Sequence, residues 1–131
     1  DGVSDVNIKN LLAFHKSHGK LVTLTSIQLP GRFGTVETDN RSIVKHFKEK
    51  PDDKDVWING GYFVLEPGIF DYLKGDTEIV QWEKEPLEHI ANDHQLVAYK
   101  HRGFWKCMDA MRDKIELEQL WESGQAKWKT W

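Results

Sequence analysis

The sequence predicts an α/β chain with a mixed sheet and one β-hairpin. Three observations support this class. Segments with helical spacing alternate with segments rich in strand-forming residues. The β-branched run at 20–28 is followed by two further runs that a short polar turn joins. The apolar run at 56–65 has the length of a buried strand rather than of a helix.

The first helix is expected after Asp5, whose carboxylate can accept hydrogen bonds from the free N–H groups of a first helical turn. Four residues with helical spacing form its predicted inner face: Ile8, Leu11, Leu12 and His15. Gly19 is expected to end this helix, because glycine readily adopts the left-handed conformation that follows a last turn.

The strands follow. Residues 20–28 predict a strand, and residues 33–38 and 42–48 predict a hairpin whose turn is 39–41. The charged loop 49–55 leads to the strand at 56–65. Within that strand, the Gly60-Gly61 pair indicates either a bulge or a place where the backbone approaches a ligand closely.

The second half of the chain predicts three helices and one strand. Pro67 and Pro86 each favour a helix start, because proline suits the first helical turn. The expected helices are 67–73, 85–93 and 113–122, the last ending near Gly124, and the expected strand is 95–100.

Charge and composition exclude several classes of function. The 18 basic and 21 acidic residues give a net charge of −3, whereas non-specific nucleic-acid binding needs a basic excess. No apolar run is long enough for a transmembrane helix, and the opening DGVSD has no signal-peptide features. The single cysteine, Cys107, excludes an internal disulfide. We therefore expect a cytoplasmic protein with no nucleic-acid or membrane partner.

Several segments together carry a resemblance to a known family. In chain order they are DGV (1–3), PGRFG (30–34), FKEKP (47–51), INGGYF (58–63) and GFWKCMD (103–109). With these segments the chain resembles the sugar-1-phosphate nucleotidylyltransferases over essentially its whole length. The segment 103–109, with WESG (121–124) and WKTW (128–131), is similar to the cytidylyltransferase branch.

The resemblance implies a doubly wound, Rossmann-like fold with its site at the strand ends. It also implies the substrates CTP and glucose 1-phosphate, the products CDP-glucose and pyrophosphate, and Mg²⁺ as cofactor. Residues 1–131 would be the C-terminal, sugar-phosphate and metal side of the domain. The glycine-rich nucleotide loop of the family has no counterpart in the sequence, so we expect the isolated chain to be inactive.

Two aspartates and one lysine match the charged centre of the family. Asp1 and Asp109 match the metal-binding carboxylates, and Mg²⁺ commonly takes one or two of these while keeping positions for phosphate and water. Lys50 matches the catalytic lysine that neutralises the sugar phosphate. These charges are needed because both reacting groups are anionic phosphates.

Four further positions match substrate-binding residues of the family. Glu49 would accept hydrogen bonds from sugar hydroxyls, and Asn59 offers both a donor and an acceptor. Gly34 and Gly60 would let the backbone approach the sugar closely. Ala110 departs from the family pattern, because the branch commonly has threonine there.

Simpler interpretations remain open at this point. Asp109 could cap the helix that follows it, Asn59 could bond its own turn, and the glycine pair could be only a bulge. The whole chain could be a non-catalytic sugar-phosphate-binding or oligomerisation module, or a nucleotidylyltransferase for another sugar or base.

The C-terminal end is rich in tryptophan. Trp121, Trp128 and Trp131 lie on a polar segment, and clustered aromatic residues at a terminus often contact a partner. Since members of the family form homo-oligomers, we expect a homo-oligomer that this tail helps to hold. The alternative is that the tail folds back on its own domain.

Overall fold

A computed structural model of the 131-residue chain describes residues 1–28, 35–48, 56–73 and 80–131. Within these ranges the elements follow one another as β1 (Gly2–Ser4), α1 (Ile8–His18), β2 (Val22–Ile27), β3 (Thr35–Thr38), β4 (Val44–Lys48), β5 (Ile58–Leu65), the 3₁₀ helix η1 (Pro67–Tyr72), α2 (Glu85–Asn92), β6 (Leu96–Lys100), β7 (Trp105–Cys107) and α3 (Met111–Glu122). The alternation of helices and strands confirms the predicted α/β class.

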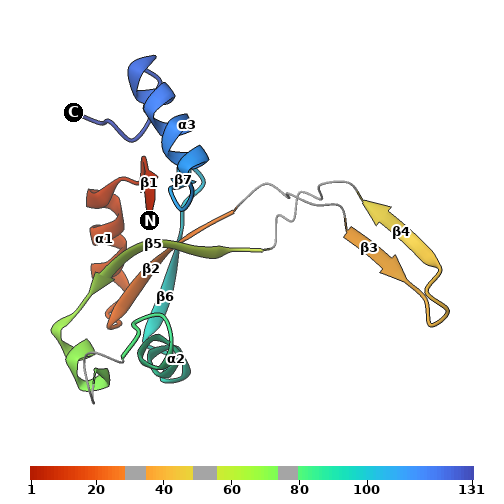
Figure 1. The fold of residues 1–131 in the computed structure, drawn as a ribbon. Helices are drawn as coiled ribbons and strands as arrows, with labels where there is room; N and C mark the ends of the chain where they lie inside the picture. The colour runs from red at the N-terminus through yellow and green to blue at the C-terminus, as the bar shows by residue number, and fades with distance from the viewer. Residues whose placement is uncertain (29–34, 49–55, 74–79) are drawn as a thin grey trace.

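The central sheet of the described residues is mixed, as predicted. Its order is β5-β2-β6, in which β2 runs antiparallel to β5 and parallel to β6 (Figure 1). All of β2 except Leu24 is buried, as is typical of a central strand. α1 packs against β2 and β5, while α2 packs against β6 and η1. The core joins Val22 of β2, Ile69 of η1 and Ile90 of α2.

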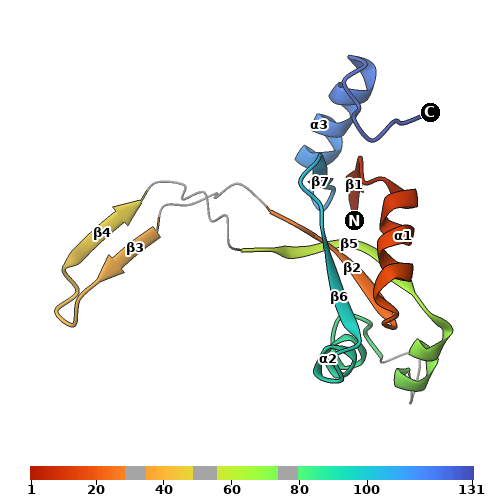
Figure 2. The same cartoon turned by 180° about the vertical axis from the view of Figure 1, so that it is seen from behind.

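Two smaller pairs accompany the central sheet. β3 and β4 form the predicted antiparallel hairpin, which extends away from the central sheet (Figures 1 and 2). In its turn, the Asp39 carboxylate accepts hydrogen bonds from the N–H groups of Arg41 and Ile43. β1 and β7 form a short antiparallel ribbon that the sequence analysis missed. Three-residue strands have no periodicity to detect, and these two are about a hundred positions apart in the chain.

The first helix differs from its prediction in two ways. Its N-cap is Asn7, whose side-chain oxygen accepts the Asn10 N–H bond at 3.0 Å, so the expectation for Asp5 was wrong. The Asp5 N–H donates to the Phe104 carbonyl instead, because the chain is still extended beside the β1–β7 ribbon. Two of the four expected inner residues, Ile8 and Leu12, are exposed. Gly19 ends the helix at φ 65°, as predicted.

A polar hydrogen-bonded network joins α1 to β2 and η1. Lys20 N–H donates to Nδ1 of His18 at 2.9 Å, which leaves the proton of a neutral ring on Nε2. That nitrogen lies 2.7 Å from the Thr23 hydroxyl, which in turn lies 2.7 Å from Nδ1 of the buried His15. Nε2 of His15 lies 3.0 Å from Oε1 of Glu66. One consistent set of donors and acceptors therefore satisfies the network with both rings neutral.

Candidate functional site

A cleft of about 500 Å³ lies between the β1–β7 ribbon and the middle of β5. Four of the predicted site residues line it: Asp1, Asn59, Gly60 and Asp109. The cleft thus brings Asp1 and Asp109, which are far apart in the sequence, to the Asn59-Gly60 segment. The other three predicted residues, Gly34, Glu49 and Lys50, lie outside the described residues.

Asp1 and Asp109 meet because β1 pairs with β7. The register places Gly2 opposite Cys107, and the Met108 N–H donates to the Asp1 carbonyl at 2.8 Å. These pairings place Asp1 and Asp109 beside each other at the end of the ribbon, where both line the cleft. The two side chains are 92% and 70% exposed, so both carboxylates remain open to a ligand from the cleft.

Asp109 does not cap the helix that follows it. The N-cap of α3 is Ala110, and Asp113 performs the capping role from inside the first turn. Its Oδ2 accepts hydrogen bonds from the N–H groups of Asp109 and Ala110 at 3.2 and 3.1 Å. These backbone bonds, with that from Ala110 the stronger, hold the pKa of Asp113 below its ordinary value. The capping alternative for Asp109 was therefore wrong, and its carboxylate is left for the cleft.

The glycine pair forms a bulge, one of the two predicted outcomes. Leu24 pairs with Phe63 and Ser26 with Asn59, so β5 carries two more residues than β2 between these pairs. Gly61 has φ 79°, a left-handed conformation that favours glycine. Oδ1 of Asn59 accepts the Gly61 N–H bond at 2.8 Å, as the simpler interpretation of Asn59 anticipated. The turn uses this oxygen, and the side-chain NH₂ group is the donor that a ligand could meet.

Gly60 has a packing reason to be glycine. A Cβ atom at this position would lie 2.9 Å from the Thr25 carbonyl oxygen and 3.1 Å from Cγ2 of Ile27. Both atoms belong to β2, so the bulge can lie against that strand only without a side chain. The expected close approach to a sugar stays a prediction beside this finding.

Two aromatic residues that the sequence analysis did not assign to the site also line the cleft. The indole N–H of Trp105 donates to the Gly60 carbonyl at 2.8 Å. The hydroxyl of Tyr62 donates to the Gly2 carbonyl at 3.3 Å, and burial raises the pKa of this phenol. Their signal in the sequence was slight: both lie in segments that carried the resemblance, but no pattern predicted which backbone they contact.

The carboxylates of the cleft fit a hard cation. Among the described residues, no group of three or more His, Cys, Asp or Glu side chains is arranged to hold a metal ion. A metal at Asp1 and Asp109 would therefore depend on these two carboxylates and on oxygen atoms of substrate or water. That donor set suits Mg²⁺ and does not suit a metal that prefers nitrogen or sulfur.

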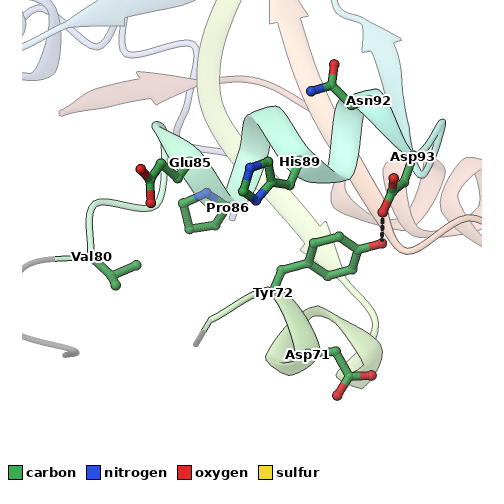
Figure 3. A pocket seen from close by; sticks show the side chains of 8 residues that line it. All are labelled: Asp71, Tyr72, Val80, Glu85, Pro86, His89, Asn92 and Asp93. Carbon is green, nitrogen blue, oxygen red and sulfur yellow. Dashed lines mark hydrogen bonds between the residues drawn. The ribbon is translucent and has the colours of Figure 1, made fainter. Parts of the chain in front are cut away.

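A second cleft, of about 440 Å³, lies between η1 and α2 (Figure 3). In it the Tyr72 hydroxyl donates to Oδ2 of Asp93 at 2.7 Å. This hydrogen bond raises the pKa of Tyr72. None of the predicted site residues lines this cleft.

The C-terminal tail partly folds back on its own domain. The Trp128 ring stacks on Phe104, with ring centroids 5.6 Å apart, and Lys129 lies over the Trp121 ring. Trp131 is 82% exposed. The predicted subunit contact through this tail stays a prediction. In the described part of the chain, no helix is long and apolar enough to cross a membrane.

Comparison with known proteins supports the same family that the sequence motifs resemble. Residues 1–122 match the family model described as nucleotidyl transferase. The whole chain is 48% identical to the glucose-1-phosphate cytidylyltransferase of Salmonella typhimurium and 37% identical to a Bacillus subtilis protein described as a probable glucose-1-phosphate cytidylyltransferase. It spans 50% of the length of each of these curated relatives.

A solved structure shares the fold. It is a Bacillus anthracis protein described as a glucose-1-phosphate thymidylyltransferase in complex with sucrose. The likeness covers 92% of this chain and 51% of that one, with a TM-score of 0.58 and 16% sequence identity. At this identity the likeness shows the fold, which agrees with the predicted α/β nucleotidyltransferase architecture.

Proposed function

Because the chain belongs to the nucleotidyl transferase family, we propose that it is the sugar-phosphate and metal-binding part of a glucose-1-phosphate cytidylyltransferase. The whole enzyme would form CDP-glucose and pyrophosphate from CTP and glucose 1-phosphate. One observation supports this most: Asp1 and Asp109 converge on the cleft that Asn59 and Gly60 also line. The identity of 48% to an enzyme with that name supports the choice of base and sugar.

The reaction joins two anions. A phosphate oxygen of glucose 1-phosphate forms a bond to the α-phosphorus of CTP, and the bond from that phosphorus to the bridging oxygen breaks. Pyrophosphate leaves with the electron pair. Mg²⁺, held by Asp1 and Asp109, would supply charge neutralisation for the phosphates.

The other residues orient the sugar phosphate. The Asn59 NH₂ group can donate to a sugar hydroxyl or phosphate oxygen in the cleft. By resemblance, Lys50 would neutralise the sugar phosphate, Glu49 would accept from sugar hydroxyls, and Gly34 would line the sugar site. Holding the two reactants in line supplies much of the rate, because it removes the entropy cost of their encounter.

We propose further that residues 1–131, which span half the length of the curated relatives, are inactive on their own. We also propose a cytoplasmic homo-oligomer. The resemblance supports both proposals, and the single cysteine, which favours a reducing compartment, supports the location.

A pyrophosphate-release assay on the full-length protein tests the function. With Mg²⁺ and glucose 1-phosphate, CTP should give turnover and a product with the mass of CDP-glucose, while UTP, GTP and dTTP should give far less. The Asp109→Asn variant should lose at least about 100-fold in rate, because the metal contributes several kcal/mol. Asp71→Asn, outside the cleft, is the matched control. Preference for another triphosphate would refute the cytidylyl assignment.

A further inference from the structure

The two sides of the cleft belong to different sheets. Asp1 immediately precedes β1 and Asp109 lies two residues after β7, so both belong to the β1–β7 ribbon side. Asn59 and Gly60 belong to β5 of the central sheet. Trp105 and Tyr62 span the space between the two sides. We propose that Trp105, with Tyr62, is a positioning residue that fixes the metal side of the cleft at a set distance from the sugar side. This inference rests on the proposed function, because it assigns the two sides those roles.

Trp105 contacts both sides with one side chain. Its indole N–H donates to the Gly60 carbonyl at 2.8 Å, which ties β7 to the bulge. Its ring also lies against Gly2 on β1. A Cβ atom at Gly2 would be 3.1 Å from the ring, closer than a side chain can normally come. The Trp105 ring therefore separates Gly2 from the β5 bulge by a fixed amount. Asp1 is the residue before Gly2, so its distance from the bulge depends on the same ring.

Tyr62 makes the reciprocal connection. Its hydroxyl donates from β5 back to the Gly2 carbonyl at 3.3 Å. Gly2 thus receives a ring contact from Trp105 and a hydrogen bond from Tyr62. Two independent donors, one from each sheet, cross the cleft in opposite directions.

Both side chains lie outside the central core. Trp105 and Tyr62 are half-buried, and neither belongs to the apolar cluster around Val22, Ile69 and Ile90. Replacing Tyr62 by phenylalanine keeps the ring and removes only the hydroxyl donor. Replacing Trp105 by phenylalanine removes the indole N–H and also the part of the ring that lies against Gly2. Such a change should loosen the spacing of the cleft while leaving the central packing unchanged.

The expected effect on catalysis is specific. A misplacement of about 1 Å between reacting groups costs on the order of 100-fold in rate. In the full-length protein, Trp105→Phe and Tyr62→Phe should each lower kcat about 10-fold to 100-fold. The KM for CTP should stay within about twofold, because the resemblance assigns triphosphate binding mainly to a loop outside residues 1–131. The fold-loss of kcat in the double variant should be smaller than the product of the two single fold-losses, because both donors hold the same pair of sheets together.

Trp121→Phe is the matched control, since Trp121 lies on the exposed side of α3. Its kcat should equal that of the wild type, and all variants should melt within a few degrees of it. If Trp105→Phe behaves like Trp121→Phe, the inference is overturned. A loss of kcat that follows the melting temperature in every variant would also overturn it, because that pattern indicates a structural role.

An NMR readout separates this inference from the proposed function. If wild-type protein releases no pyrophosphate, the proposed function fails, and the connection across the cleft is judged by amide shifts instead. Trp105→Phe should move the resonances of Gly60 and Gly61 and should speed hydrogen exchange at the Gly2–Ser4 segment, whereas Trp121→Phe should do neither. Unchanged Gly60 and Gly61 resonances would refute the connection itself.

Discussion

The Met108 N–H donates to the Asp1 carbonyl at 2.8 Å and so places Asp1 beside Asp109, although 107 positions separate Asp1 from Met108 in the chain. Pairing of β1 with β7 produces this contact, and Asp113 leaves the Asp109 carboxylate exposed by capping α3 in its place. A pair of open carboxylates at one end of a cleft is what a hard cation between two phosphates requires.

The bulge at β5 should depend on Gly60 more than on Gly61. Gly60→Ala should destabilise the protein by roughly 1–3 kcal/mol, because its methyl group would collide with the Thr25 carbonyl on β2. Gly61→Asn should cost much less, since asparagine tolerates the left-handed conformation and nothing lies within 4 Å of the added Cβ. Thermal unfolding of both variants measures the difference. Equal melting temperatures would contradict the packing explanation.

The N-terminus of α3 offers a stabilising substitution. Ala110 has the extended conformation of an N-cap, with φ −129° and ψ 158°, but makes no side-chain cap bond. Ala110→Ser should therefore add about 1 kcal/mol of stability. That corresponds to a rise in melting temperature of roughly 3–6 °C for a domain of this size. Ala126→Ser, beyond the end of α3, should change the midpoint little. A fall at Ala110→Ser would show that the cap position is already satisfied.

The network around His18 should make stability fall in mild acid. Burial lowers the pKa of His18 from its ordinary 6.5, and the nearby His15 and Lys20 lower it further. The unfolded chain then binds the proton more readily, so the stability contributed by neutral His18 is present above pH 6.5 and is lost as pH falls toward the folded pKa. Protonation of His18 at Nδ1 also breaks the hydrogen bond that this nitrogen accepts from the Lys20 N–H. Among the described residues, Glu66 is the one carboxylate that the network contacts.

Melting temperatures between pH 7.5 and 5.5 measure this effect. His18→Asn should flatten the pH dependence, because the amide oxygen can accept the Lys20 bond and does not titrate. His94→Asn, at an exposed position where φ is 56° and asparagine is tolerated, should keep the wild-type slope. Parallel curves for wild type and His18→Asn would contradict the assignment.

If the tail holds subunits together, deleting residues 125–131 should reduce the number of subunits per assembly of the full-length protein in solution. Trp128 already stacks on Phe104 of the same chain, which leaves the exposed Trp131 as the expected subunit contact. Trp131→Ala should then weaken assembly without disturbing that stack. Size-exclusion chromatography with light scattering measures the mass. An unchanged mass after the deletion would count against the tail contact.

Elements with a local signal could be predicted from the sequence. The β-branched run of β2, the Asp39 turn of the hairpin and Gly19 after α1 each act through neighbouring residues, so their positions follow from the chain itself. The N-cap of α1 could not be assigned as surely, since Asp5 and Asn7 both suit the role. The contact of Asp5 with the distant Phe104 carbonyl decides between them.

The site divides in the same way. Resemblance of motifs identified Asp1, Asn59, Gly60 and Asp109, which the structure places around one cleft. These residues meet only because β1 pairs with β7, and strands of three residues are too short for the sequence to predict that pairing. The roles of Trp105 and Tyr62 depend on backbone carbonyls of Gly60 and Gly2, and sequence patterns carry no information about such partners.

The most direct test is a crystal structure of the full-length protein with Mn²⁺, glucose 1-phosphate and a non-hydrolysable CTP analogue. The anomalous signal of manganese locates the metal directly. The account predicts one peak within coordination distance of carboxylate oxygens of both Asp1 and Asp109, with the sugar phosphate in the same cleft beside Asn59. A peak that neither aspartate contacts, or a sugar phosphate bound elsewhere, would contradict it.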